Sequence, residues 1–156
     1  MKYKHSLWIF YTIIFLLFSS SVIVLELISE QNYKRSIILS RLDSYSVILS
    51  QTDDYETILP LLPEDLRITI LDATGGVTFD SYESSNTLEN HLQRPEVKDC
   101  LSKGSGNAIR TSETSHQKYL YYAKQYNTRI IRLAQPFEIN LRHYFRPDWD
   151  ILISIF

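Results

Sequence analysis

The chain has 156 residues, with 16 Lys or Arg against 18 Asp or Glu, so its formal net charge is −2. Hydrophobic residues make up 44%, and only four Gly and five Pro occur, which excludes a disordered chain and a fibrous repeat. The near-neutral charge gives no reason to expect a nucleic-acid partner. The single cysteine excludes an internal disulfide and any zinc site built from cysteines.

The first feature along the chain is the uncharged segment Ser6–Leu25. A helix of about 20 residues spans roughly 30 Å, the thickness of a bilayer's hydrocarbon core. Lys2 and Lys4 precede the segment and Glu26 follows it, so the positive-inside rule places the N-terminus in the cytoplasm and the rest outside. A signal peptide cleaved near Ser19–Ser21 is the alternative, but its apolar region would be only about 7–15 residues long. We therefore expect an uncut transmembrane helix.

The chain ends on a second apolar segment, ILISIF, at residues 151–156. Six residues cannot cross a bilayer, so we expect the beginning of a second transmembrane helix. A short terminal strand or helix end is the alternative. The region between the two segments, residues 26–150, holds all 18 acidic residues and 14 of the 16 basic ones, a formal charge of −4.

A long helix is expected to leave the membrane over Glu30–Gln51. Its apolar residues are spaced by 4, 3 and 4 positions, which is a helical period. This stripe packs on the neighbouring domain, on a second copy of the chain in a parallel dimer, or on both. The residues expected to form this stalk contact are Ile38, Leu42, Tyr45 and Leu49.

The middle of the chain alternates short apolar runs with turn residues, which predicts an α+β domain with a five-stranded antiparallel sheet. On the helix expected after Pro95, Val97, Cys100 and Leu101 share a face, so Cys100 is expected in the core. The expected elements are strands Leu66–Asp72 and Val77–Asp80, a helical turn Asn86–Arg94, a helix Pro95–Lys103, strands Gly106–Ser112, Lys118–Gln125 and Arg129–Gln135, and an amphipathic helix Phe137–Phe145.

These elements predict five parts along the chain. They are a cytoplasmic tip with the first transmembrane helix (residues 1–25), a stalk helix and connector (26–59), the α+β domain (60–136), a C-terminal helix (137–150) and the start of a second transmembrane helix (151–156).

Several ordered motifs between Leu66 and Phe137 resemble one protein family. The segments RITILDATGGVTFDS, NHLQRPE, GSGNAIRTSET, YLYYAKQ and RIIRLAQPF are similar to the extracytoplasmic sensor region of phosphate-regulon-type transmembrane histidine kinases of bacteria. The matching positions are Asp72, Gly75, Asp80, Ser81, Asn90, His91, Arg94, Pro95, Glu96, Gly104, Gly106, Arg110, Ser112, Thr114, Tyr121, Tyr122, Ala123, Arg132 and Ala134.

The resemblance implies a PAS-like, single-Cache sensor domain held between two helices of the bacterial cytoplasmic membrane and working as a homodimer. In that family the kinase core passes the signal to a response regulator. This chain has no HAMP-like linker, phospho-acceptor histidine box or ATP-binding lid. We therefore expect no catalytic residue and no cofactor, and we interpret the chain as an input region truncated before the kinase.

A small anionic ligand is the candidate for the signal. Arg110 and Arg132 fall in neighbouring or near-neighbouring strands with Tyr119 and Tyr121 between them, and guanidinium and phenol groups bind anions well. His91 and Arg94 are expected at the rim. The alternative is that Arg94 and Arg110 form ion pairs with Asp80, Glu96 or Glu113. His91 and His116 are too sparse for a metal site, so none is expected.

Two other functional classes remain open. A pilin-like structural protein would share the N-terminal membrane helix and the sheet, but the cleavage site of a pilin leader is absent and ILISIF would have no role. The input domain of a chemoreceptor or a cyclase would share the fold and differ only in the output region beyond Phe156.

Overall fold

The computed structural model describes residues 2–83, 89–112 and 116–137. Two compact units divide the chain, Met1–Arg41 and Leu42–Phe156. Helix α1 (Lys2–Ser50) contributes residues to both, and the sheet belongs entirely to the second unit.

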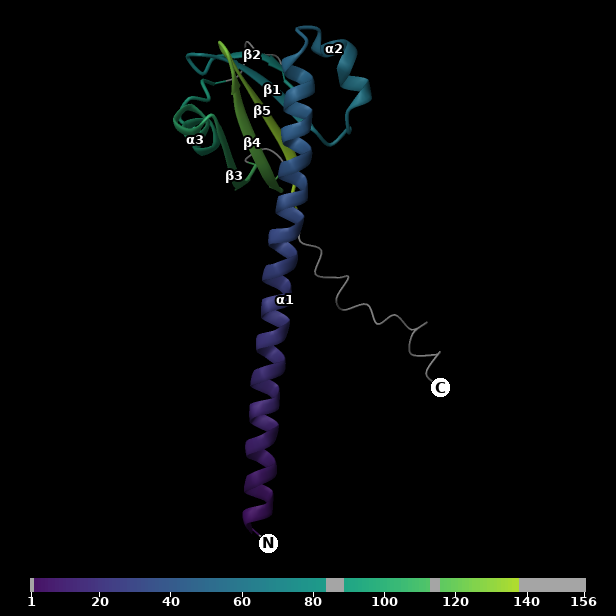
Figure 1. Ribbon diagram of the computed structural model, residues 1–156, viewed down its shortest axis with the longest axis vertical. Helices are drawn as coiled ribbons and strands as arrows, with labels where there is room; N and C mark the ends of the chain where they lie inside the picture. Colours follow the sequence, from purple (N-terminus) through teal and green to yellow (C-terminus); the bar gives the residue numbers. More distant parts are fainter. Residues whose placement is uncertain (1, 84–88, 113–115, 138–156) are drawn as a thin grey trace. The chain divides into compact units, whose positions relative to one another are not determined.

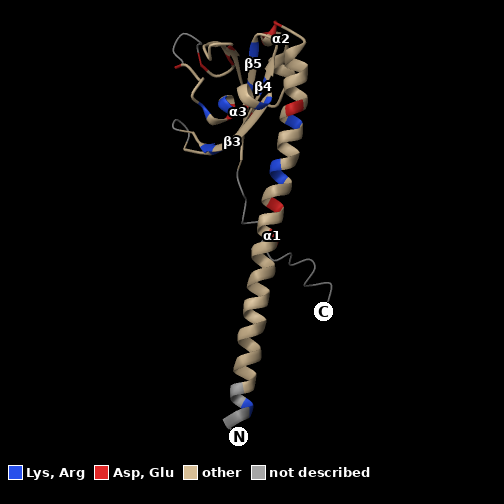
Figure 2. Cartoon of the chain, turned by 60° about the vertical axis from the view of Figure 1, so that its left-hand side comes forward, with Lys and Arg blue, Asp and Glu red and all other residues tan. Residues whose placement is uncertain are grey.

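The N-terminal part of α1, residues 7–25, carries no charged residue and is exposed at nearly every position. Trp8, Phe15 and Leu25 are among its large exposed side chains, and Figure 2 shows the uncharged stretch of this helix. The hydroxyl of Thr12 donates to the carbonyl of Trp8 at 2.8 Å, so this polar group is satisfied within the helix. Among the described residues, α1 is the one helix long and apolar enough to cross a membrane.

The second unit is an α+β domain built on a five-stranded antiparallel sheet, as the sequence predicts. The strands lie in the order β2-β1-β5-β4-β3 (Figure 1). β1 is therefore an interior strand, hydrogen-bonded to its hairpin partner β2 and to β5, which is the last strand of the chain and the middle strand of the sheet. The strands are β1 (Arg67–Asp72), β2 (Val77–Asp80), β3 (Ser105–Thr111), β4 (Lys118–Tyr126) and β5 (Arg129–Pro136).

One face of the sheet carries helix α3 (Pro95–Lys103). Val97 and Cys100 of this helix form an apolar cluster with Leu71, Ala123 and Ile130 of the sheet. Cys100 is fully buried, as expected, and burial raises the pKa of its thiol to about 11. We call this side of the sheet the α3 face.

Glycine permits the close approach of α3 to the edge strand β3. A Cβ atom at Gly106 would overlap the carbonyl oxygen of Glu96 and lie 2.6 Å from the Cβ of Asp99. The helix ends at Gly104, whose φ of 83° favours glycine.

The opposite face of the sheet carries the last turns of α1. Tyr122 and Ala123 are adjacent in β4, so their side chains point to opposite faces, and the Tyr122 hydroxyl donates to Asp43 of α1 at 2.6 Å. Lys124 also donates to Asp43 at 2.6 Å, and these two bonds lower the pKa of the Asp43 carboxyl. Ser46 Oγ lies 2.9 Å from the Tyr126 hydroxyl.

The burial of the four predicted stalk residues shows which of them pack within the domain. Leu42 and Leu49 are fully buried in the second unit, so both belong to the core of the protomer. Tyr45 and Ile38 are half-buried. The sequence allows the stalk residues to pack on the domain, on a second copy, or on both. Leu42 and Leu49 are buried within the domain, so neither side chain is free to contact a second copy.

Three further expectations differ from the structure or lie outside it. Residues 89–94 hold a turn, closed by the Arg94 amide and the His91 carbonyl at 3.0 Å, and not a helical turn. The connector expected before the sheet contains two short helices, α2 (Tyr55–Ile58) and η1 (Leu59–Leu61). The expected helix Phe137–Phe145 and the segment 151–156 lie outside the described residues, apart from Phe137.

Candidate functional site

Strand register gathers the predicted arginines and tyrosines on the α3 face. Arg110 of β3 lies opposite Tyr119 of β4, and Tyr121 lies opposite Ala134 of β5, two residues from Arg132. Residues two apart in a strand share a face, so all four side chains belong to the same side of the sheet. The sequence could place these residues in strands but could not fix the register that brings them together.

Glu96 of α3 joins two of these arginines. Its Oε1 atom accepts from Arg132 Nε at 2.8 Å and from Arg110 Nη2 at 3.1 Å. The Glu96 side chain is fully buried, that of Arg132 is 5% exposed, and that of Arg110 is 26% exposed. Burial lowers the pKa of Arg132, although the charge of Glu96 opposes this effect. The expected alternative pairing of Arg110 with Glu96 is therefore confirmed.

Two guanidinium groups thus share one carboxylate oxygen. Within the described part of the chain, the second oxygen, Glu96 Oε2, has no hydrogen-bond partner, and neither does Arg110 Nε. Buried polar atoms in proteins are nearly always hydrogen-bonded, because desolvating an unpaired group costs about 1–3 kcal/mol.

The ring of Tyr121 contacts both arginines. Arg110 Cζ lies 4.4 Å and Arg132 Cζ 4.5 Å from the ring centroid, which are cation–π distances. Tyr119 is half-buried and its ring centroid lies 6.1 Å from that of Tyr121. The Tyr121 ring therefore stabilises the positive charges of Arg110 and Arg132, and Tyr119 packs against that ring.

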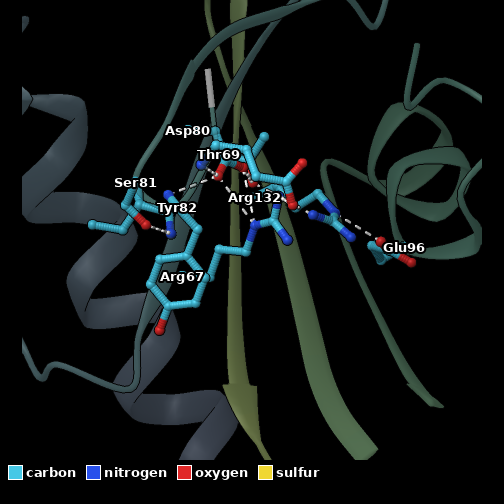
Figure 3. A network of polar contacts seen from close by, with 9 residues as sticks. Arg67, Thr69, Asp80, Ser81, Tyr82, Glu96 and Arg132 are labelled. Carbon is cyan, nitrogen blue, oxygen red and sulfur yellow. Dashed lines mark hydrogen bonds and ion pairs between the residues drawn. The ribbon is translucent and has the colours of Figure 1, made fainter. Parts of the chain in front are cut away.

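A second ion pair adjoins the first on the same face (Figure 3). Arg67 Nε donates to Asp80 Oδ2 at 3.1 Å, and Thr69 Oγ1 donates to the same oxygen at 2.8 Å. Arg132 Nη1 lies 3.4 Å from Thr69 Oγ1, so Thr69 links the two pairs. Asp80 was expected to pair with Arg94 or Arg110, and its actual partner Arg67 was missed, although Arg67 begins the strand that forms a hairpin with the strand of Asp80.

His91 and Arg94 approach this cluster from the loop before α3. His91 is 5% exposed, and burial together with the charges of Arg132, Arg94 and Arg67 lowers its pKa to about 4. Arg94 is half-buried at the N-cap of α3 and forms no ion pair with any residue that the structure describes. Glu113, the third expected partner, lies outside the described residues.

A second polar feature surrounds Arg129, near the end of α1. Arg129 donates to the carbonyl of Ser50 at 2.6 Å and to the Tyr55 hydroxyl at 2.7 Å, and it pairs with Asp53. Arg129, Tyr55 and Asp53 border an open depression of about 480 Å³. The guanidinium of Arg129 is bound by Ser50, Tyr55 and Asp53, so it stabilises the end of α1, and Asp53 neutralises its charge.

Among residues 2–83, 89–112 and 116–137, no group of His, Cys, Asp and Glu side chains is arranged to hold a metal ion. No protein-family model matches the sequence, and no curated protein matches it either.

Proposed function

We propose that this chain is the membrane-anchored input region of a two-component sensor histidine kinase, with its α+β domain on the outer side of the cytoplasmic membrane. The motifs from Leu66 to Phe137 support the family, because they resemble its PAS-like sensor region. The apolar part of α1, which is long enough to cross a bilayer, supports the anchor. Lys2 and Lys4 support an N-terminus in the cytoplasm.

The observation that carries the proposal is that α1 is one continuous helix with two functions. The same helix contains the apolar segment and the residues that hydrogen-bond to the sheet, Asp43 and Ser46. A signal that shifts the sheet between two arrangements would therefore act directly on a helix that enters the membrane. The shift requires a ligand or stress that favours one arrangement, since equal affinity for both would move nothing.

Topology is the first test. In a Cys100→Ala background, a cysteine placed at the exposed Ser102 should react with a membrane-impermeant maleimide in intact cells, and a tag at the N-terminus should not be accessible. Ser102 lies in the last turn of α3, where a new thiol disturbs no core contact. Labelling that requires permeabilised cells would contradict the outer location of the domain.

The kinase assignment has a separate test. The nucleotide sequence after the codon of Phe156 should complete a second membrane helix and then encode a phospho-acceptor histidine box. A chemoreceptor or cyclase would show a different output domain at the same place. A reading frame that closes at once would overturn the kinase assignment and leave a membrane-anchored domain.

A further inference from the structure

The depression of about 480 Å³ beside Arg129 lies along the β1–β2 hairpin, within the second unit. Its volume falls in the range of small-molecule sites, about 300–1,000 Å³. A β-bulge lies in its wall: Ile70 pairs with Phe79 and Leu71 with Val77, so the register leaves Thr78 without an opposite residue in β1. The buried side chains of Ile70 and Leu71 give the depression an apolar floor.

The charges that line the depression do not balance. Two carboxylates, Asp53 and Asp72, and one guanidinium, that of Arg129, give the lining a net charge of −1. Asp72 lies opposite Arg129 in the β1–β5 pair, but Arg129 binds Ser50, Tyr55 and Asp53 instead. Asp72 forms no ion pair with any residue that the structure describes. The unbalanced charge is therefore that of Asp72.

The turn after β1 holds Asp72 in its anionic form. Asp72 Oδ1 accepts from the hydroxyl and the amide of Thr74, each at 2.7 Å, and from the amide of Gly76 at 2.9 Å. These hydrogen bonds lower the pKa of the Asp72 carboxyl. Its second oxygen, Oδ2, has no hydrogen-bond partner among the described residues, so a ligand has an acceptor there.

Two aromatic rings line the same depression. The ring centroids of Tyr55 and Phe79 lie 5.1 Å apart, and Arg129 Cζ lies 5.9 Å from the Tyr55 centroid. No cation of the described residues lies over the Phe79 ring. Phe79 lies opposite Ile70, two residues before Asp72 in β1, so the three side chains belong to one face of the sheet. The depression thus combines an unpaired carboxylate with an aromatic ring, and both attract cations.

We propose that this depression binds a small organic cation of the alkylammonium class, with Asp72 as its counter-ion and the Phe79 ring as its aromatic wall. An alkylammonium group suits both parts of the site, because its charge pairs with the carboxylate and its carbon atoms contact the ring and the apolar floor. This inference names the ligand class of the sensing domain proposed above and rests on that proposal for its biological meaning.

The bound cation would contact two elements of the domain. Asp72 and Phe79 belong to the β1–β2 hairpin, whereas Asp53 and Tyr55 belong to the segment that directly follows α1. A ligand between them favours the arrangement in which the hairpin and this segment lie close together. The site therefore offers a ligand one way to act on the end of α1.

The test is calorimetric titration of the full chain in maltoside micelles, because this detergent carries no ammonium group. Tetramethylammonium, choline and butylammonium chlorides are each compared with sodium chloride at equal ionic strength, and we expect saturable binding of at least one. Asp72→Asn should weaken it by about tenfold or more, since the charge is lost while an oxygen remains for the turn. Glu56→Gln is the matched control, because Glu56 is an exposed carboxylate next to Tyr55 that does not line the depression.

Phe79→Leu supplies a second variant that leaves the turn of Asp72 unchanged. It should weaken binding by about threefold or more, because the cation–π contact is lost and an apolar side chain remains. Tyr82→Leu removes an exposed ring outside the depression and should leave the affinity unchanged. No saturable binding beyond sodium, equal losses in Asp72→Asn and Glu56→Gln, or unchanged affinity in Phe79→Leu would each overturn the inference. None of these results would alter the topology or reading-frame tests.

Discussion

At the scale of single residues, His91 shows how the positive cluster affects a neighbouring group. Burial lowers the pKa of its imidazole to about 4, the positive charges of Arg132, Arg94 and Arg67 act in the same direction, and the charge of Asp80 opposes them. The ordinary pKa of histidine is 6.5, so between these two pH values the folded state binds fewer protons than the unfolded state. Stability is therefore greatest above this window and falls as the pH drops through it.

We expect His91→Asn to remove part of this pH dependence. Comparing urea unfolding at about pH 7 and about pH 5, the unaltered chain should lose up to roughly 2 kcal/mol more than the variant. His116→Asn is the control, because His116 is exposed and its φ of 53° is tolerated by Asn. Identical pH profiles for the unaltered chain and His91→Asn would show that the imidazole is not held neutral.

The contacts of single residues could be predicted from the sequence only in part. Cys100 was expected in the core because the helical period of its segment places it on one face with Val97, and the Arg110–Glu96 pair was one of several pairings expected as an alternative. The sharing of Glu96 between Arg110 and Arg132 could not be predicted. It depends on register across three strands and on the approach of α3, which sequence spacing does not encode.

At the scale of elements, the end of α1 is a core helix. Leu49 is fully buried and its neighbour Ile48 is 47% exposed, so the two residues provide a matched pair. Leu49→Ala should lower the free energy of unfolding by about 2–5 kcal/mol, through lost apolar burial and a new cavity. Ile48→Ala should cost less than about 1 kcal/mol. Denaturant unfolding of the full chain in micelles measures both, and equal losses would contradict the docking of this helix.

Most elements could be predicted because their periods are local. The bounds of α3 were predicted to the residue, and each strand was placed within about one residue of its observed ends. Helices α2 and η1 were missed because Pro60 and Pro63 indicate an irregular connector. Two short helices are equally compatible with prolines at these positions. The interior position of β1 was not predicted, since its pairing with β5 joins segments far apart in the chain.

At the scale of the whole molecule, a homodimer remains a prediction, and its contact residues can now be narrowed. In the first unit Tyr33 is 68% exposed and Ile37 is 41% exposed, one helical turn apart. In the second unit Leu42 and Leu49 are fully buried. If two copies pair along the stalk, Tyr33 and Ile37 are available for the contact, whereas Leu42 and Leu49 are not.

Cysteine cross-linking in membranes tests this assignment. In a Cys100→Ala background, cysteines at Tyr33 or Ile37 should form disulfide-linked dimers on mild oxidation, and cysteines at Leu42 or Leu49 should form few. The reversed pattern would mean that the end of α1 does not pack on the sheet when the protein is in a membrane. No cross-link at any of the four positions would contradict a stalk dimer.

The position of β1 also determines when this domain can fold. Its two neighbours are β2, which comes directly after it in the chain, and β5, which begins at Arg129. The sheet lacks the strand that joins its two halves until β5 has been synthesised, and such long-range pairing slows folding. If the domain crosses the membrane as proposed, nearly the whole of it must therefore be exported before its core can close, and the chain travels unfolded until β5 reaches the outer side.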